Sequence, residues 1–419
     1  MEKCFVYIQL PQTLETVVCG RFERERLSSG DYVGRFIYGR SYRTRQNAVE
    51  IDPIHLPLVE RQFDTLALNG IFGALRDSGP DAWGRRVIEH AMGRLDLGEV
   101  DYLLNSPHDR AGALSFGLNE VPPPPNRSFN KTIQLETLLK AATELESLEF
   151  GAPLSAELRQ LQQLVDTGTS MGGARPKNVV EDDSGLWLAK FPSKSDRWNN
   201  AAVEAGMLSL ASQCDIRTPP FRVQNVAGAS VLLIQRFDCQ KTGAPGKTDY
   251  FRSRMVSALT VLGGDETANR ERWSYLDLSD EIRRWSEKPV LDRAELFRRM
   301  VFNALVTNND DHPRNHALLA NTARWRLSPV YDVTPSPVHS HERDLAMISG
   351  IQSGRRATKS NLLSGSARFG LTIEEASATI DKLRAIVTRN WEAAVRHHGA
   401  TPADCATIQP AFAIPGFDD

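Results

Sequence analysis

The chain has 419 residues, of which 41% are hydrophobic, so it can bury a large core, and its length suggests two or three structural units. Its 50 basic and 52 acidic residues give a net charge of −2. No overall field therefore attracts nucleic acid or an anionic membrane, and a role on DNA would need a partner or a local patch.

The first part of the chain has the pattern of a small α+β domain. Its apolar segment at residues 1–8 ends too soon for a signal peptide and predicts a first strand. Residues 36–42 predict a further strand, and helices are expected around Trp83 and Tyr102. Residues 35–45, with their interleaved tyrosines, are typical of an alternating strand face, and contact with nucleic acid is the alternative.

Four consecutive prolines mark the end of this part. Residues 122–125 continue neither a helix nor a central strand, so the segment predicts a stiff linker, with a ligand for a polyproline-binding domain as the alternative. The predicted domains are an N-terminal subdomain at 1–121, the linker at 122–130, a small lobe at 131–240 and a helical large lobe at 241–419.

After the linker, residues 131–166 have helical periodicity. Strands are predicted at residues 179–180, 186–191 and 231–234, together with an amphipathic helix at 201–212. This is the order of elements in the small lobe of a protein kinase.

Residues after about 240 are predicted to be mainly helical up to Asp310. The clearest helix is expected at 293–308, where apolar residues line one face and Asp292 is a candidate N-cap. Another amphipathic pattern at 372–397 predicts helices that pack at the C-terminal end without chemistry of their own.

The most informative motif follows the helix at 293–308. Asp310 is followed by Asn315 five residues later, and Asp332 comes beyond a short predicted hairpin. In protein kinases this layout supplies a carboxylate that accepts the proton of a substrate hydroxyl, and an Asn and an Asp that hold Mg²⁺ against the nucleotide phosphates. Oxygen ligands of this kind suit Mg²⁺.

Six blocks along the chain include this motif, and their order is informative. They lie at residues 73–85 (GALRDSGPDAWGR), 170–177 (SMGGARPK), 188–192 (LAKFP), 236–238 (RFD), 310–315 (DDHPRN) and 331–333 (YDV). Together they resemble the HipA family, the serine/threonine kinase toxins of toxin–antitoxin pairs.

The resemblance implies a role for individual residues. Asp310 is the implied catalytic base, and its neighbour Asp311 is the competing candidate for that role. Asn315 and Asp332 are the implied Mg²⁺ ligands. Lys190 is the implied phosphate-binding lysine and Glu204 its ion-pair partner, although an exposed strand lysine and a surface helix acid are the alternatives. The implied ATP-binding residues are Gly172, Gly173, Ala174, Lys177, Lys190, Gln235, Phe237, Asp238, His312, Arg314, Asn315 and Tyr331.

Several of these residues carry a more specific expectation. The glycine-rich turn that ends at Lys177 would wrap phosphate oxygens with its backbone N–H groups. The backbone around Gln235 would grip adenine, and Asp238 would reach a ribose hydroxyl. For His312, a scaffold or nucleotide-contact role is favoured over a general base or a metal ligand. Ser170 is the implied site of inactivating autophosphorylation, where a phosphate would eject the loop.

The chain departs from the family pattern at three positions. Asp311 stands where many members have Gly, Arg314 where Lys is usual, and Gln235 where Glu is more frequent. Arg and Lys differ in donor geometry, so Arg314 bears on the phosphate contact.

The resemblance also implies a fold and partners. The expected fold class is α+β, with a small N-terminal α/β domain before a bilobed kinase-like domain. The expected activity is ATP- and Mg²⁺-dependent phosphorylation of a cellular protein, which in characterised members is an aminoacyl-tRNA synthetase. The implied partner is a helix-turn-helix HipB-like antitoxin, through which the pair would bind operator DNA.

Other functions remain open on the sequence alone. One alternative is an ATP-binding regulatory module of an operator complex with little turnover, and another is a kinase for a small molecule or lipid. Five scattered cysteines without Cys-x-x-Cys spacing, and no apolar run of about 20 residues, predict a cytoplasmic protein with reduced thiols and no membrane span.

Overall fold

The computed structural model describes residues 2–106, 110–124, 129–148, 175–243, 249–265 and 269–419. The chain divides into two compact units. The first contains Met1–Ser193, Gln235–Val256 and Leu319–Ala323, and the second contains Lys194–Ile234, Ser257–Leu318 and Arg324–Asp419. The predicted domain boundaries at residues 121, 130 and 240 stay a prediction.

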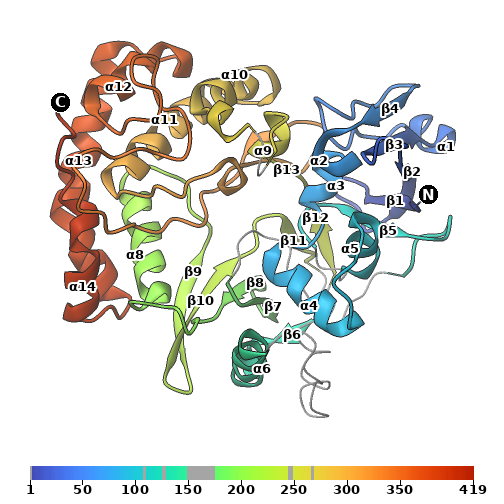
Figure 1. Ribbon diagram of the computed structural model, residues 1–419, viewed down its shortest axis with the longest axis horizontal. Coiled ribbons are helices and arrows are strands. Elements are labelled where there is room, and N and C mark those ends of the chain that lie inside the picture. Colours follow the sequence, from blue (N-terminus) through green and yellow to red (C-terminus); the bar gives the residue numbers. More distant parts are fainter. Residues whose placement is uncertain (1, 107–109, 125–128, 149–174, 244–248, 266–268) are drawn as a thin grey trace. The chain divides into compact units, whose positions relative to one another are not determined.

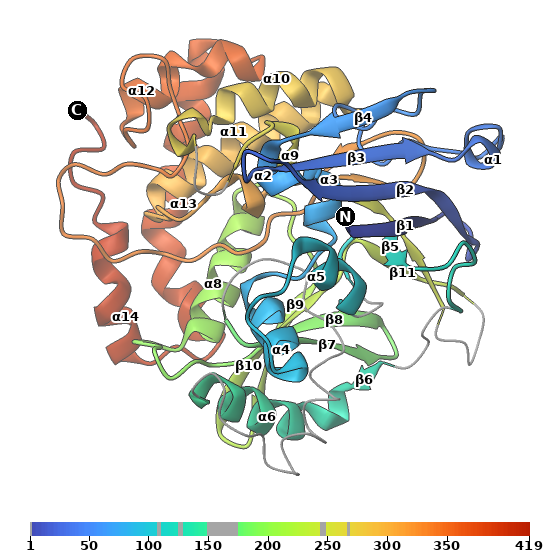
Figure 2. The same ribbon diagram turned by 45° about the vertical axis from the view of Figure 1, so that its right-hand side comes forward.

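The first unit begins with a five-stranded antiparallel sheet in the order β4-β3-β2-β1-β5 (Figure 2). The expected first strand is confirmed as β1. The strands are β1 (Glu2–Gln9), β2 (Thr16–Arg26), β3 (Tyr32–Tyr38), β4 (Gln62–Thr65) and β5 (Leu114–Gly117). The helices of this part are α1 (Arg40–Arg43), α2 (Ala67–Gly70), α3 (Gly73–Asp77), α4 (Ala82–Met92) and α5 (Glu99–Asn105), so the helices expected around Trp83 and Tyr102 are confirmed.

The strand predicted at residues 36–42 is wrong in its second half. Strand β3 ends at Tyr38, and Tyr42 lies in the short helix α1. The helical turn stacks the Tyr42 ring on Tyr38 with the centroids 6.0 Å apart, and the Tyr42 hydroxyl donates to the Val49 carbonyl at 2.7 Å. Aromatic residues favour strands, but here tertiary packing of the two rings decides the conformation.

The second part of this unit contains the strands expected around the glycine-rich turn. Strand β6 pairs in parallel with β7, and β7 pairs antiparallel with β8. Val179, Leu186, Leu188 and Tyr250 form a buried apolar cluster on these strands and on β12. The elements are β6 (Asn130–Lys131), η1 (Thr132–Gln134), α6 (Leu135–Ser147), β7 (Lys177–Asp182), β8 (Gly185–Lys190), β11 (Cys239–Lys241) and β12 (Tyr250–Arg252).

Helix α6 confirms the first half of the helical pattern at 131–166. The remainder of that pattern lies outside the described residues, except for residue 148, which follows α6. The expectation of mainly helical structure after residue 240 is wrong at its beginning, because β11, β12 and β13 (Arg254–Ser257) come first.

The second unit is largely helical. Its strands β9 (Phe221–Val226) and β10 (Ala229–Gln235) form an antiparallel hairpin up to Ile234. Strands β13 and β14 (Ala317–Ala320) each pass from one unit to the other, and β15 (Arg326–Leu327) follows. The helices are α8 (Asn200–Gln213), α9 (Ala258–Val261), η2 (Arg270–Arg272), α10 (Tyr275–Trp285), α11 (Pro289–Leu305), η3 (Pro313–Asn315), α12 (Lys359–Ser364), η4 (Ser366–Phe369), α13 (Ile373–His397), α14 (Pro402–Ile408) and η5 (Gln409–Phe412).

Helix α8 lies beside α13 (Figure 1). The prediction of an amphipathic helix here is wrong in one respect, because α8 is buried almost all round from Ala202 to Leu208. A Cβ atom added to Gly206 would come within 2.6 Å of the Val395 Cα atom on α13. The glycine thus permits the close approach of the two helices.

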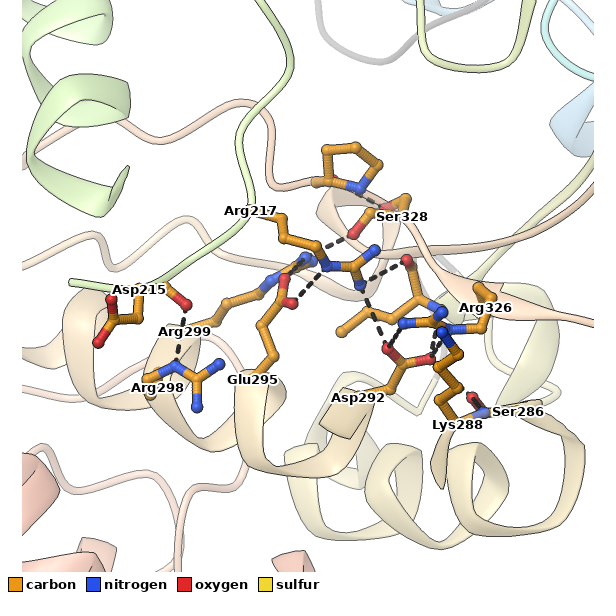
Figure 3. A network of polar contacts seen from close by, with 12 residues as sticks. Asp215, Arg217, Ser286, Lys288, Asp292, Glu295, Arg298, Arg299, Arg326 and Ser328 are labelled. Atoms are coloured by element: carbon orange, nitrogen blue, oxygen red, sulfur yellow. Dashed lines mark hydrogen bonds and ion pairs between the residues drawn. The ribbon is translucent and has the colours of Figure 1, made fainter. Parts of the chain in front are cut away.

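Helix α11 is the helix predicted at 293–308, but it begins earlier, at Pro289, and ends at Leu305. Proline is favoured in the first turn because its missing N–H needs no partner there. Asp292 is therefore not the N-cap, and its carboxylate instead accepts hydrogen bonds from Arg326 Nη2 and Nε, at 2.8 and 2.9 Å (Figure 3). The helix at 372–397 is confirmed as α13, with Thr372 in a capping box.

The fold class is α+β, as predicted. All five cysteines are free thiols. Within the described part of the chain, no helix is both long enough and apolar enough to cross a membrane.

Candidate active site in the second unit

The turn that follows α11 is held in an unusual backbone conformation. Thr307 has a φ of +51°, a left-handed value that a β-branched residue rarely adopts. Its hydroxyl donates to the Ala411 carbonyl at 2.6 Å and accepts from Arg343 at 3.0 Å. These contacts stabilise a strained turn immediately before Asp310, and strain of this kind gathers at functional sites.

Asp310 and Asn315 are connected through the backbone of one loop. The His312 N–H donates to the Asp310 carbonyl at 2.7 Å, and the Asn315 N–H donates to the His312 carbonyl at 2.9 Å. The Asn315 side-chain Nδ2 also donates to the Asp310 carbonyl, at 3.3 Å. The amide nitrogen of Asn315 is thus held by the loop, and its side-chain oxygen is the atom suited to a metal.

Tyr331, the residue before Asp332, contacts the same loop from beyond the hairpin. The Ser328 N–H donates to the Ala317 carbonyl at 2.8 Å, which confirms the predicted hairpin between Asn315 and Asp332. The Tyr331 hydroxyl donates to the Arg314 carbonyl at 2.7 Å. Asp332 itself has a φ of +59°, so a second left-handed residue lies at the site.

Partial burial of its carboxyl raises the pKa of Asp310. The residue as a whole is exposed, but the surrounding protein removes part of the water around its carboxyl, and this is the main cause of the increase. His312 opposes it, while Asp332 and Asp311 add to it as like charges, and Arg270 opposes it more weakly. Asp310 and Asp332 therefore lie near enough to interact electrostatically.

The donor set fits Mg²⁺. Asn315 and Asp332 offer an amide and a carboxylate oxygen, the hard ligands that this ion prefers. Among the described residues no three His, Cys, Asp or Glu side chains gather as a metal cluster. A Mg²⁺ site of one or two protein ligands completed by water and phosphate oxygens needs no such cluster.

The His312 ring packs against another aromatic ring and is not part of a cluster of metal ligands among the described residues. Its imidazole meets Trp273 edge-on, with the centroids 6.4 Å apart. Pro313, Arg314 and Asn315 form the single turn η3 that follows it. This agrees with a scaffold role, while its contact with nucleotide stays a prediction.

In the first unit, the described end of the glycine-rich segment is anchored by a buried ion pair. Lys177 begins β7, is 2% exposed, and donates from Nζ to Asp81 Oδ2 at 2.8 Å. Asp81 is the N-cap of α4, and its other oxygen accepts from the Gly84 N–H at 2.8 Å. A phosphate contact by Lys177 would require this pair to open, so that role stays a prediction.

The block at 236–238 contains a second buried ion pair. The Arg236 guanidinium donates to both oxygens of Asp238, at 3.0 and 2.6 Å, and the Gly112 N–H donates to Asp238 Oδ2 at 2.9 Å. Burial by itself would raise the pKa of Asp238, but Arg236 and the other donors outweigh it and hold the pKa below its ordinary value. Asp238 is 0% exposed, so the predicted ribose contact would require a rearrangement.

The remaining predicted residues belong to both units. Lys190 ends β8 in the first unit, whereas Glu204 is a buried residue of α8 in the second, and their ion pair stays a prediction. The Gln235 side chain donates to the Ser184 carbonyl at 2.9 Å, and Phe237 is partly buried. Ser170, Gly172, Gly173 and Ala174 lie outside the described residues.

Sequence reasoning named Asp311 only as the rival of Asp310 and missed the partners with which it supports the loop that carries Asp310 and Asn315. Asp311 is buried at 2% exposure and binds the buried side chains of Tyr275 and His316. The position of His316, directly after Asn315, was a signal for it, but nothing in the sequence pointed to Tyr275. Asp81 lies within the block at 73–85, which gave no indication of its partner.

Comparison with known proteins places these features in context. A model of the HipA-like C-terminal domain matches residues 169–391. Two Sinorhizobium fredii proteins designated only as candidate kinases, Y4mE and Y4dM, are 23% and 24% identical over 171 and 234 residues. These matches cover 41% and 51% of this chain but only 39% and 53% of the relatives, so the chain spans about half their length or less.

A solved structure matches nearly the whole chain. It is a chain from the Shewanella oneidensis MR-1 toxin–antitoxin complex of HipA, HipB and operator DNA. The alignment covers 97% of this chain and 96% of that one, with a TM-score of 0.65 and 14% sequence identity. The likeness establishes a common fold.

Proposed function

The chain belongs to the family of proteins with a HipA-like C-terminal domain, and from this premise we propose that it is an ATP- and Mg²⁺-dependent serine/threonine protein kinase. The observation that carries the proposal is the hydrogen bond from the Asn315 side chain to the Asp310 carbonyl, with Asp332 near enough to contribute to the raised pKa of Asp310. The kinase-designated relatives support it.

In the proposed reaction, Asp310 orients the attacking hydroxyl of a Ser or Thr side chain. The hydroxyl oxygen forms a bond to the γ-phosphorus of ATP while the bond from that phosphorus to the β–γ bridging oxygen breaks, and ADP leaves. The hydroxyl proton passes to the Asp310 carboxylate. Positioning of this kind by a general base contributes about 10²- to 10⁴-fold to the rate.

Asn315 and Asp332 would hold Mg²⁺, which offsets the negative charge of the phosphates. Arg314, on the same short turn as Asn315, would add a guanidinium near the phosphates. Lys190 and the glycine-rich segment would contribute to phosphate binding, with His312, Tyr331, Gln235 and Phe237 as further nucleotide contacts.

The proposal extends to a toxin of a toxin–antitoxin pair. The partner would be a helix-turn-helix antitoxin that brings the complex to operator DNA, as suggested by the name of the Shewanella complex. The substrate would be a cellular protein, with an aminoacyl-tRNA synthetase as the first candidate. Autophosphorylation of Ser170 would inactivate the kinase by adding nearly two negative charges to the nucleotide loop.

Mass spectrometry of the purified protein incubated with Mg²⁺ and ATP tests the proposal. We expect phosphate on Ser170 in the wild type and a loss of at least about 100-fold in its rate of appearance in Asp310→Asn. Asp215→Asn is the matched control, because Asp215 is an exposed acid of the same unit that pairs with Lys382 on the surface. It should retain the wild-type rate.

Two results would count against the kinase. If Asp310→Asn acquires phosphate as fast as the wild type, Asp310 is not the catalytic base. If the wild type binds ATP but transfers phosphate neither to Ser170 nor to any added protein, the protein kinase is excluded.

A further inference from the structure

We propose that Asp311 is a positioning residue that locks the loop carrying Asp310 and Asn315 onto the helical core of the second unit. The inference rests on the proposed function and goes beyond it, because it assigns a role to the position where the family resemblance often has glycine. Asp311 is adjacent to the proposed base but is buried at 2% exposure, whereas Asp310 is exposed.

The Asp311 carboxylate makes two side-chain contacts through one oxygen. Its Oδ2 accepts a hydrogen bond from the Tyr275 hydroxyl and another from His316 Nε2, the latter at 2.8 Å. A carboxylate only accepts, so the proton of the imidazole lies on Nε2. Both partners are 0% exposed, and their rings meet edge-on with the centroids 5.7 Å apart.

These partners connect the loop to three helices. Tyr275 is the first residue of α10, and its hydroxyl also accepts from Asn303 of α11 at 3.3 Å. Asn303 in turn accepts at Oδ1 from the Asn308 side chain at 3.1 Å. The His316 carbonyl accepts from the N–H of Ala258, the first residue of α9, at 2.8 Å.

Each of the two anchored residues is next to a residue of the proposed site. Asp311 directly follows Asp310, and His316 directly follows Asn315. The hydrogen bond between the Asp311 and His316 side chains therefore closes the loop and holds the residues adjacent to the proposed base and to the proposed metal ligand. A buried carboxylate in a low-dielectric setting holds its donors firmly, and loss of one partner leaves the others unsatisfied.

The consequence is a defined kinetic signature. Loosening the loop should displace Asp310 from the attacking hydroxyl, whereas Lys190 and the glycine-rich segment lie outside the loop and keep their proposed part in nucleotide binding. A misplacement of about 1 Å in a catalytic group costs about 100-fold in rate. We therefore expect a larger effect on kcat than on the KM for ATP.

The test compares Asp311→Asn and Tyr275→Phe with the wild type. Tyr275→Phe removes only the hydroxyl, so it keeps the inference testable if Asp311→Asn fails to fold. We expect kcat for Ser170 phosphorylation to fall about 10- to 100-fold in Asp311→Asn, and less in Tyr275→Phe, with a smaller change in the KM for ATP. Backbone hydrogen exchange of residues 308–316 should accelerate in both variants and stay unchanged elsewhere.

Gly206→Ala is the control for general destabilisation, because it disturbs the packing of α8 on α13 and touches no residue of the loop. It should lower the melting temperature while kcat and exchange at 308–316 keep their wild-type values. Two results would overturn the inference. One is a folded Asp311→Asn variant whose kcat and hydrogen exchange equal those of the wild type. The other is a Gly206→Ala variant that melts at the same temperature as Asp311→Asn and loses as much activity.

Failure of the proposed function is distinguishable from failure of this inference. If the wild type transfers no phosphate, the kinase proposal fails by itself. The exchange of residues 308–316 then decides on its own whether Asp311 holds the loop.

Discussion

At the scale of single residues, the buried carboxylate of Asp292 accepts hydrogen bonds from several neighbours. Asp292 is 0% exposed and accepts from Arg326, from Arg217 at 3.3 Å, from the Ser286 hydroxyl at 2.6 Å and from the Leu327 N–H at 3.0 Å (Figure 3). Removing the charge of such a group lowers the free energy of unfolding, because its cationic partners then lose their counter-ion.

Asp292→Asn should therefore destabilise the protein strongly. We expect a loss of about 3 to 5 kcal/mol in the free energy of unfolding, measured by urea denaturation at pH 7. Asp215→Asn is the matched control, because the same atom change occurs in an exposed ion pair, and Asn tolerates the left-handed backbone found there.

The control should change stability by no more than about 1 kcal/mol. An equal effect of the two substitutions would show that burial of Asp292 contributes nothing to stability.

At the scale of elements, one contact between two helices sets an unusual requirement on sequence. In an exposed helix, replacing Gly by Ala stabilises by about 1 kcal/mol through helix propensity. At Gly206 the added Cβ atom would lie 2.6 Å from Val395 Cα, a backbone atom that cannot rotate away. Overpacking of this kind costs about 1 to 3 kcal/mol, so steric conflict should outweigh propensity.

Gly206→Ala is thus expected to lower the free energy of unfolding in urea, despite its better helix propensity. Ser212→Ala is the control on the same helix, because Ser212 is exposed and meets no such neighbour. It should be neutral or slightly stabilising. Stabilisation by Gly206→Ala would mean that α8 and α13 are less closely packed than described.

At the scale of the whole molecule, stability should depend on acid pH through several buried carboxyls. Burial by itself would raise the pKa of Asp292 and of Glu295, but the hydrogen bonds and charges of Arg326, Arg299 and Arg217 outweigh it. The pKa of each carboxyl in the folded state therefore lies below its value in the unfolded chain, which is about 3.9 for Asp and about 4.3 for Glu.

The sign of the pH dependence follows from this direction. A carboxyl with a lowered folded pKa contributes stability that is fully present above the unfolded pKa and is lost as the pH falls through the folded value. Urea denaturation should thus give nearly constant stability from pH 7 to about 5 and a steep decrease below about 4. The decrease should be shallower in Asp292→Asn, and an unchanged slope would contradict the role of Asp292.

The sequence by itself determined the family and the α+β class, and it indicated the segment that is proposed to carry the chemistry. Periodicity predicted α11, α13, β1, β7, β8 and β10, because each of these patterns depends on local spacing of apolar residues. The motif at Asp310, Asn315 and Asp332 was legible because its members lie within 23 positions of one another in the chain.

Only the tertiary structure decided which partner each buried polar group takes. The pairs Asp81–Lys177 and Tyr275–Asp311 join residues that are far apart in sequence, and no local pattern encodes them. Contacts between distant residues also place Tyr42 in a helix and bury α8 almost all round. They likewise let Asp292 bind Arg326 instead of capping its helix. Burial makes an unpaired polar group costly, so the fold selects these partners, and it does so from residues that the sequence keeps apart.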